Sequence, residues 1–434
     1  MTADSRNIVL VSIDSLRGDH CGFLGDARNL TPTLDSLAET GVAYQNAIAP
    51  GPQTFSSMPE VFTGRRRRPT ALDEYPQETH WERRLAAINE HMRRHASLAE
   101  RLQSEGYDTG AVTPNPWTST ASGFERGFDE FVDFSEASSD RWVTSVADRI
   151  PGIDADGRPV ELLSNLLSGS EFFARWEALY DDIERVRESL SDPYFLWVFI
   201  LDTHFPFIPS RTHHEEQSLF GTYYSAYRSS EPMRGNGGEL SPRVRESVLR
   251  SYRDTVRSAD AFVAKLRSDL ARDDPALLVH SDHGESFGDH GNYGHHHRQV
   301  YEENVRVPYL VHNAGVSADV TEAISLRSVR DTALAIARNG TFDPHAAAAS
   351  YAVASSECGT KRALRGVQFK RIESGDDARL FDLEADPNEQ SDVSAARPGV
   401  MTELGRQLDR ADSGTVETER IHAAAQQIVD RKSI

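Results

Sequence analysis

Three short apolar runs, each followed directly by acidic or histidine residues, constrain the fold of this chain more than any other feature. The runs cover residues 7–13, 194–201 and 276–280, and they are rich in aliphatic and aromatic side chains. Continuous runs of this kind are typical of strands that are buried on both faces, as in parallel sheets covered by helices. The chain is therefore predicted to adopt an α/β fold with a mostly parallel central sheet flanked by helices.

The polar residues after these runs are the first candidates for a functional site. Asp14 follows the first run, Asp202 and His204 follow the second, and Asp-His-Gly-Glu at 282–285 follows the third. The carboxyl ends of parallel strands meet at one edge of the sheet, where α/β proteins bind their ligands. We interpret Asp14 as a metal ligand, with a helix N-cap as the alternative. For His204 the alternative is a buried, hydrogen-bonded histidine.

The segment 51–64 carries the candidate nucleophile, Thr54. Gly51 and Pro52 interrupt a predicted strand at 42–47, and the residues after Thr54 can begin a helix. The Thr54 side chain would then lie near a helix N-terminus, where backbone N–H groups favour an anion. Taken alone, a threonine at such a position is usually only a helix cap.

The remaining patterns complete the predicted organisation. We expect a catalytic α/β domain over 1–320, with a helical insertion at 138–191, and a C-terminal subdomain of short strands and terminal helices over 321–434. Further helices are predicted at 31–41, 91–105, 244–270 and 325–337, with one or two terminal helices over 400–430. Further strands are predicted at 107–113, 305–311, 351–356 and 363–372, and 379–390 is predicted as a strand entering a turn.

Charge and composition argue against several functions. The 434 residues carry a formal charge of -20 without a dominant basic patch, so nucleic acid is not an expected partner. No apolar run reaches the roughly 20 residues of a membrane-spanning helix. The N-terminus has no apolar signal region, and two cysteines are too few for a disulfide framework. A cytoplasmic location is therefore expected.

The chain has a surplus of acidic residues and few lysines, and we interpret this composition as that of a halophilic protein. An ordinary acidic cytosolic protein is the alternative. The run Arg65–Arg68 is the one basic cluster, and it directly follows the Thr54 segment. It is interpreted as a solvated loop, with attraction of an anionic substrate as the alternative.

Six motifs occur in a fixed order along the chain. They are Asp14; Thr54-x-x-Ser57 followed by Thr63-Gly64; Asp202-x-His204-x-Pro206; Asp282-His283-Gly284-Glu285; Glu302-Glu303-x-x-Arg306-Val307-Pro308; and Leu380-Phe381-Asp382-Leu383-x-x-Asp386-Pro387-x-Glu389. Together they resemble the sulfatase family of the alkaline phosphatase superfamily, over nearly the whole chain. The resemblance implies an alkaline-phosphatase-like fold and a hydrolase that acts on small anionic esters. The last two motifs are interpreted as structural.

The resemblance also implies a metal site. One divalent ion (Ca²⁺, Mg²⁺, Mn²⁺ or Zn²⁺) is expected on Asp14, Thr54, Asp282 and His283. Carboxylates suit Mg²⁺, Ca²⁺ or Mn²⁺, whereas the histidine shifts the balance toward Mn²⁺ or Zn²⁺.

Other residues are expected to bind the substrate. By the resemblance, His204 contacts the anionic oxygens of the ester, and one of His295–His297 binds substrate or protonates the leaving group. His295 and His297 are therefore candidates, and Arg17 is a further candidate for substrate binding. Alternatively, these histidines hold a second metal ion together with Asp202 or His204.

The chain departs from the sulfatase pattern at the nucleophile. Thr54 stands where sulfatases carry the Cys or Ser that is oxidised to formylglycine, and Ser56 and Met58 replace the Pro and Arg of the Cys-x-Pro-Ser-Arg pattern. Ser15 replaces the second of the paired N-terminal Asp residues. Formylglycine is therefore not expected. A threonine at this position resembles the phosphodiesterases, phosphoglycerol transferases and mutases of the superfamily.

The expected reaction is attack of metal-bound Thr54 on phosphorus or sulfur through a covalent threonine ester. Phosphoester, phosphodiester or phosphonate substrates are favoured. The alternatives are a sulfuric-ester hydrolase without formylglycine, a phosphoglycerol-type transferase, and a catalytically silent binding protein. Oligomeric state is left open.

Overall fold

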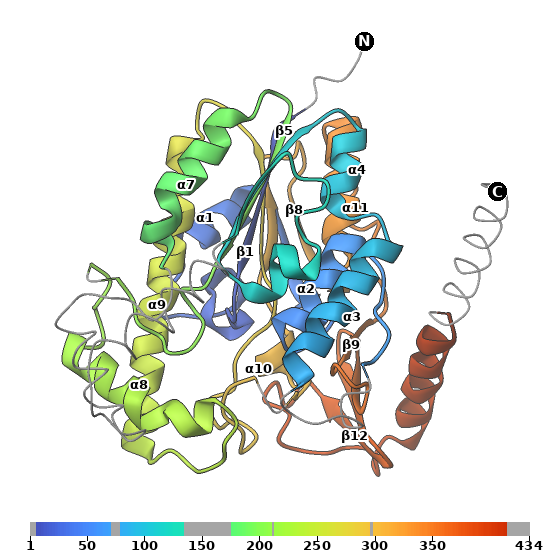
Figure 1. Ribbon diagram of the computed structural model, residues 1–434. Coiled ribbons are helices and arrows are strands. Elements are labelled where there is room, and N and C mark those ends of the chain that lie inside the picture. Colours follow the sequence, from blue (N-terminus) through green and yellow to red (C-terminus); the bar gives the residue numbers. More distant parts are fainter. Residues whose placement is uncertain (1–5, 71–78, 134–174, 211, 296–297, 415–434) are drawn as a thin grey trace.

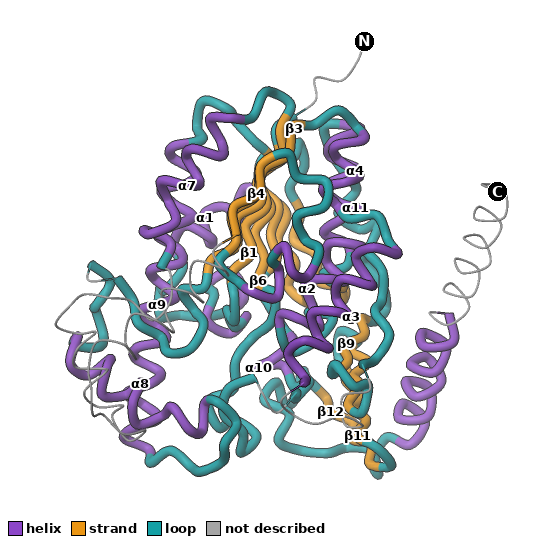
Figure 2. Tube along the Cα trace, in the orientation of Figure 1, coloured by secondary structure: helices purple, strands orange, loops and turns teal. Residues whose placement is uncertain are grey.

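The computed structural model describes residues 6–70, 79–133, 175–210, 212–295 and 298–414. A large eight-stranded sheet lies between two layers of helices, and a small four-stranded sheet packs beside it in the C-terminal part (Figures 1 and 2). This arrangement confirms the predicted α/β class.

The large sheet has the strand order β4-β3-β5-β1-β6-β7-β2-β8. Its centre consists of the parallel strands β5 (Tyr194–Ile200), β1 (Ile8–Ile13) and β6 (Ala276–Ser281), which are the three predicted apolar runs. β7 (Tyr309–His312) is antiparallel to its neighbours β6 and β2 (Val42–Ile48). The outer strands are β3 (Asp108–Thr113), β4 (Glu130–Asp133) and β8 (Ala318–Ser325).

Helices cover both faces of this sheet (Figure 1). One layer contains α1 (Pro32–Thr40), α7 (Trp176–Ser189) and α9 (Pro242–Asp269); the other contains α2 (Thr54–Thr63), α3 (His80–Arg94), α4 (Leu98–Ser104) and α11 (Ser328–Asn339). The remaining labelled helices are α8 (Leu219–Met233) and the short α10 (Glu302–Val305), η1 (Gly18–His20), η2 (Gly22–Leu24), η5 (Pro116–Thr118) and η6 (Thr120–Ser122).

Strand β1 shows why its sequence lacks polar alternation. Val9, Val11 and Ile13 belong to the core under α1, α7 and α9, whereas Ile8 and Leu10 belong to the core on the opposite face. All five side chains are buried. Successive side chains of a strand point to opposite faces, so a strand covered on both faces is apolar at nearly every position. The one polar residue of β1, Ser12, is buried with its hydroxyl 2.9 Å from His280 Nε2.

Two predicted elements differ from the structure near helix ends. The predicted helix 91–105 is divided between α3 and α4 by Ser97, whose hydroxyl accepts a hydrogen bond from the Glu100 N–H at 3.1 Å. The Glu100 carboxylate in turn accepts from the Ser97 N–H at 2.8 Å, which completes a capping box and starts a new helix. The predicted strand 305–311 begins only at Tyr309, because α10 occupies 302–305.

The C-terminal sheet is antiparallel, with the order β12-β11-β10-β9. One of its faces packs on the large domain through Ala354, Ile372 and Phe381, and the other packs under Leu404 and Leu408 of a helix at 398–414. The predicted strand 363–372 is a hairpin of two strands. The four strands are β9 (Ala352–Ser355), β10 (Lys361–Arg365), β11 (Phe369–Ser374) and β12 (Asp377–Asp382).

The predicted domain limits are partly visible. β8 and α11 pack with the large sheet, which therefore continues beyond the predicted boundary at residue 320. Of the predicted insertion, α7 is helical as expected, while 138–174 lie outside the described residues, as do 415–430 of the terminal helices. Within the described ranges, no helix is long and apolar enough to cross a membrane.

Candidate active site

The predicted metal ligands meet at the carboxyl edge of the large sheet. Asp14 directly follows β1, and Asp282 and His283 directly follow β6. These strands are parallel neighbours with Ile13 opposite Ser281, so the register places the two carboxylates side by side. Potential ligand atoms of Asp14, Asp282 and His283 all lie within 4.8 Å of one another, and all three residues are buried.

The hydrogen bonds of Asp282 and His283 leave suitable ligand atoms facing one another. Asp282 Oδ1 accepts from the N–H groups of Ser15 at 3.2 Å and His283 at 2.8 Å, whereas the buried Oδ2 has no hydrogen-bond partner in the described part of the chain. His283 Nδ1 lies 2.7 Å from the Gly284 carbonyl oxygen, which directs Nε2 inward. That Nε2 is 3.6 Å from both Asp14 Oδ1 and Asp282 Oδ2. An unpartnered buried carboxylate oxygen beside an imidazole nitrogen fits a divalent cation.

Burial changes the protonation of this cluster. It raises the pKa of Asp14 to about 6, with a further contribution from the charge of Asp282, and it raises the pKa of Asp282 to about 7. Burial lowers the pKa of His283. These shifts reflect mainly the cost of charging a buried group, and a bound cation would offset that cost for the two carboxylates.

Thr54 lies against the same cluster. It is the first residue of α2, as predicted, and its Oγ1 is 3.4 Å from His283 Nε2. Asn115 joins the two: its Nδ2 donates to Asp14 Oδ2 at 2.9 Å and to Thr54 Oγ1 at 3.4 Å. Thr54 is 5% exposed, so a reacting group would meet this hydroxyl in a largely enclosed environment.

Asn115 was missed by the sequence reasoning. It follows strand β3, so it obeys the same rule that identified Asp14 and Asp282. Its position in an Asn-Pro pair is an ordinary turn signal and does not by itself indicate a site. Its amide is buried and bridges the candidate nucleophile and a candidate metal ligand.

Two of the predicted histidines stand beside the cluster. The His295 ring centroid is 4.7 Å from that of His283 and 5.3 Å from that of His204. His295 Nδ1 lies 3.2 Å from both carboxylate oxygens of the buried Glu285, and burial lowers the pKa of His295 well below its ordinary value. His204 Nδ1 is 2.6 Å from the Phe205 carbonyl oxygen. His297 lies outside the described residues.

Asp202 is directed elsewhere. Its Oδ1 accepts from the Ser258 hydroxyl at 2.9 Å and its Oδ2 from the Trp176 N–H at 3.2 Å, which ties the end of β5 to α9 and α7. Among the described residues, the one group of three or more side chains with metal-ligating spacing is Asp14, Asp282 and His283. A second metal ion at Asp202 or His204 stays a prediction.

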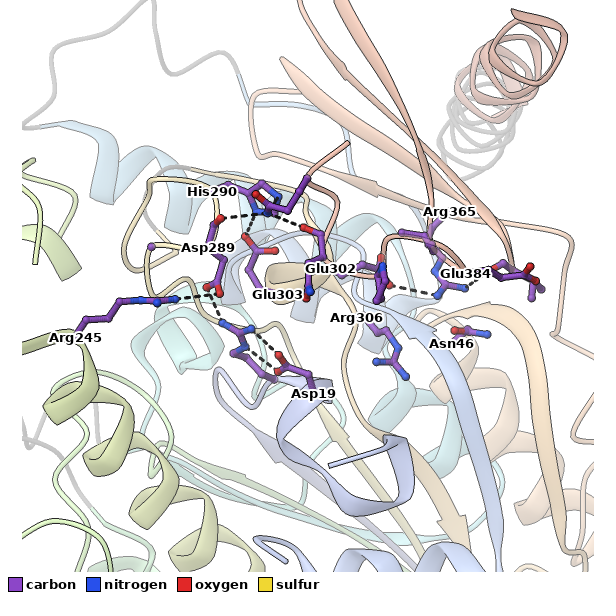
Figure 3. A pocket seen from close by; sticks show the side chains of 17 residues that line it. Asp19, Asn46, Arg245, Asp289, His290, Glu302, Glu303, Arg306, Arg365 and Glu384 are labelled. Atoms are coloured by element: carbon purple, nitrogen blue, oxygen red, sulfur yellow. Dashed lines mark hydrogen bonds and ion pairs between the residues drawn. The ribbon is translucent and has the colours of Figure 1, made fainter. Parts of the chain in front are cut away.

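Arg17 lies in a different environment. Its guanidinium pairs with Asp19 at 2.6 Å and Asp289 at 3.0 Å, and donates to the Glu285 carbonyl oxygen at 3.1 Å. It lines a cavity of about 670 Å³. Figure 3 shows the neighbouring wall, where Asp289 also faces Arg245. All these partners are the chain's own groups, so the role of Arg17 as a substrate ligand stays a prediction.

The residues that depart from the sulfatase pattern have structural partners. Ser15 Oγ donates to Asp14 Oδ1 at 2.9 Å, and Ser56 Oγ donates to the Gln53 carbonyl oxygen at 2.8 Å. Met58 is completely buried in the apolar core on the α2 side of the sheet. Position 58, which lies within the helix that begins at Thr54, therefore carries no guanidinium.

Comparisons with known proteins agree with this geometry. The family model described as Sulfatase matches residues 6–337. The arylsulfatase of Clostridium perfringens is 22% identical over 346 residues, which cover 71% of this chain and 69% of the relative. Human iduronate 2-sulfatase is 25% identical over 364 residues, covering 74% of this chain but 62% of the relative.

The fold also matches solved structures. A phosphonate monoester hydrolase of Agrobacterium radiobacter superimposes with a TM-score of 0.62 at 19% identity, covering 94% of this chain and 96% of that chain. At this identity, the likeness shows a shared fold. The alkaline-phosphatase-like architecture predicted from the motifs is thereby confirmed.

Proposed function

The chain belongs to the sulfatase family, and from this premise we propose that it hydrolyses esters with Thr54 as the nucleophile. The family and its similar proteins support an ester hydrolase. One observation carries the assignment of Thr54: its hydroxyl is enclosed with Asp14 and His283 at the carboxyl edge of the sheet, with Asn115 bridging to it. A helix cap alone has no need of buried acids around it.

We propose that Asp14, Asp282 and His283 hold a divalent cation, with Thr54 as a further ligand. When bound, such an ion stabilises negative charge and lowers the pKa of a coordinated hydroxyl. The protein prepares the site through fixed hydrogen bonds: Asn115 and Ser15 orient Asp14, and the Gly284 carbonyl orients the His283 ring.

The proposed reaction has two steps. Thr54 Oγ1 forms a bond to phosphorus while the bond from phosphorus to the alcohol oxygen breaks. The threonine hydroxyl proton passes to solvent, from which the histidine that protonates the leaving group is reprotonated. The leaving alkoxide takes a proton from the imidazole of His204, whose ring adjoins that of His295 beside the cluster. Water then attacks the covalent threonine ester, frees the acid product and restores the Thr54 hydroxyl.

Phosphorus esters, including phosphodiesters and phosphonates, are the favoured substrates. Thr54 has a methyl group on Cβ, and the buried Met58 provides no guanidinium near an aldehyde hydrate. Both features argue against formylglycine chemistry. A sulfuric-ester hydrolase that uses the Thr54 hydroxyl directly is the second candidate, supported by the sulfatases among the similar proteins.

A substrate panel tests this proposal. Aryl phosphate monoesters, phosphodiesters, phosphonate monoesters and sulfates are each assayed with Mg²⁺, Ca²⁺, Mn²⁺ and Zn²⁺. Thr54→Ala should lower kcat by about a thousandfold or more, as expected when a nucleophile is removed. Thr54→Ser, which retains a hydroxyl, should keep part of the activity. Thr40→Ala, at an exposed position of α1, is the control. Wild-type turnover by Thr54→Ala would refute the proposal.

A further inference from the structure

A second cavity adjoins the helix that carries Thr54. It has a volume of about 740 Å³ and lies between the start of α2, the segment 66–69 and the C-terminal sheet. Ser56, two residues after Thr54, forms part of its wall. Gly51 packs so closely here that a Cβ would lie 2.9 Å from the Ser355 carbonyl oxygen. The C-terminal sheet therefore forms one wall of a cavity whose other wall includes the helix that carries the candidate nucleophile.

The wall formed by the C-terminal sheet is also linked to the histidine side of the site. Cys358 lines the cavity, and its sulfur lies 3.3 Å from Nη1 of Arg298, three residues after His295. Lys361, which begins β10, donates to the Gln299 side chain at 2.9 Å. The C-terminal sheet thus contacts the chain on both sides of the candidate site, on the Thr54 side and on the His295 side.

The acidic residues of this cavity are already neutralised. Glu60 pairs with Arg327 at 2.9 Å, and Glu357 pairs with Arg84 at 2.9 Å. Neither of these arginines lines the cavity. The other two acids pair as well: Glu373 with Arg371 and Arg362, and Asp412 with Arg66 and Arg362.

Arg67, which also lines the cavity, differs from these arginines because its side-chain partner is a hydroxyl and not a carboxylate. Its Nη1 donates to the Thr70 hydroxyl at 2.9 Å, and within the described ranges no carboxylate lies at ion-pair distance from its guanidinium. The side chain is partly buried, and burial lowers its pKa although Glu357 and Glu60 act in the opposite direction. A partly buried guanidinium with no carboxylate at ion-pair distance is a suitable partner for an anion, because a charge-assisted hydrogen bond would offset its desolvation. The cavity therefore has a surplus of positive charge at Arg67.

We propose that this cavity binds the alcohol portion of the substrate, and that Arg67 binds an oxyanion, a carboxylate or a sulfate, at the far end of that portion. The inference rests on the proposed function, because it assumes that the ester to be cleaved lies at Thr54. It also gives the run Arg65–Arg68 a local role in place of general attraction.

The geometry sets the length of such a substrate. Glu60, whose Oε1 accepts from the Arg67 N–H at 2.7 Å, is six residues after Thr54 in α2. At about 1.5 Å per residue, α2 rises about 9 Å from Thr54 to Glu60, and the oxyanion is proposed to lie at a comparable distance from the reacting atom. This exceeds the width of a single sugar or aryl ring. The substrate is thus an extended ester with a distal negative charge.

Binding measurements test the inference without turnover. The ligands are alkylphosphonates of increasing chain length that end in a carboxylate, a sulfonate or an uncharged carboxamide. Because their carbon–phosphorus bond is not hydrolysed, calorimetry on the full chain with Mn²⁺ reports affinity alone. Above a threshold length, an anionic end should bind about tenfold more tightly than the carboxamide. The better of the two anions identifies the kind of group that the natural substrate carries.

Variants locate the effect. Arg67→Gln should remove the preference for the anionic end, and Arg67→Lys should restore part of it. Arg243→Gln, an equal charge change at an exposed position of α9, should retain the full preference. Equal binding of all three ligand series at every length, or no binding of any, would overturn the inference. Turnover of aryl esters by Thr54 variants tests the nucleophile separately, so failure of either proposal is recognisable.

Discussion

At the scale of single residues, the site depends on side chains that hold other side chains. Asn115 donates to both Asp14 and Thr54, and no other described residue joins the candidate nucleophile to a carboxylate through an amide. Residues that orient metal ligands commonly affect metal affinity or activity by ten- to a hundredfold. Asn115 is accordingly a positioning residue in this account.

Replacement of Asn115 by alanine should therefore weaken metal binding and lower kcat/KM, each by about ten- to a hundredfold. A metal titration with activity as the readout measures both the metal affinity and kcat/KM. The matched control is Asn339→Ala, at the exposed end of α11. If the Asn115 variant binds metal and turns over substrate as the control does, the bridging role is wrong.

The raised pKa values of Asp14 and Asp282 predict a pH effect on the metal-free protein. Their pKa values are about 6 and about 7 in the folded state, against an ordinary value of 3.8. A buried carboxyl with a raised pKa stabilises the fold most when protonated. The contribution is therefore complete below about pH 4 and is lost as pH rises to about 7.

A bound cation offsets this loss, so the stabilisation by metal should grow with pH over the same window. Melting temperatures of protein with EDTA and with Mn²⁺, compared at about pH 5 and about pH 8, measure it. The difference should be larger at the higher pH, and Asp282→Asn should reduce it. A metal effect that is equal at both pH values would contradict the cluster as the binding site.

Most of the candidate site could be predicted from the sequence, because residues that directly follow buried parallel strands lie together at one edge of the sheet. Asp14, Asp282 and His283 follow apolar runs that could only be buried strands, and the structure places them together. Sequence reasoning missed Asn115 because β3 contains few apolar residues and is followed by an ordinary turn pair, so the strand end did not stand out. It could not foresee that Arg17 pairs with Asp289, since that contact joins segments 272 residues apart.

At the scale of elements, the first and last residues of helices and strands were harder to predict than the presence of each helix or strand. The buried strands and the long helix α9 occur where the apolar pattern indicated. The predicted helix 91–105 failed at Ser97, because a capping box satisfies backbone N–H groups at a new helix start. Apolar periodicity alone does not reveal such a break when both helices bury the same face.

The capping box gives a stability prediction. Ser97→Ala should lower the free energy of unfolding by about 1 kcal/mol, because the hydroxyl that accepts from Glu100 N–H is lost. Chemical denaturation measures the change. Ser36→Ala, at an exposed position inside α1, should cost much less. Equal losses in the two variants would show that the Ser97 cap does not stabilise α4.

At the scale of the whole molecule, the charge distribution is uneven. The chain carries 67 acidic against 47 basic residues, yet the cavity beside α2 holds a surplus arginine. Like charges spread over a surface repel one another, and salt screens them. The acidic surface repels an anionic substrate, so the surplus arginine would attract its negative charge only locally, within the cavity.

Salt should therefore stabilise the folded protein. The melting temperature should rise as KCl increases from about 0.1 M to about 1 M, since the Debye length falls from about 10 Å to about 3 Å. Sucrose at equal osmolality serves as a control for solvent exclusion. A melting temperature that falls with KCl would contradict the halophilic interpretation of the composition.

The central claim, that Thr54 forms a covalent ester, has a direct test in the mass of the whole protein. Wild-type protein is quenched in acid during turnover of its best phosphorus ester, and intact mass and peptide mapping follow. The account predicts an added phosphoryl or phosphonyl group on the peptide that contains residues 51–64, located on Thr54 and absent from Thr54→Ala. An adduct on another residue, or turnover by Thr54→Ala at the wild-type rate, would contradict it.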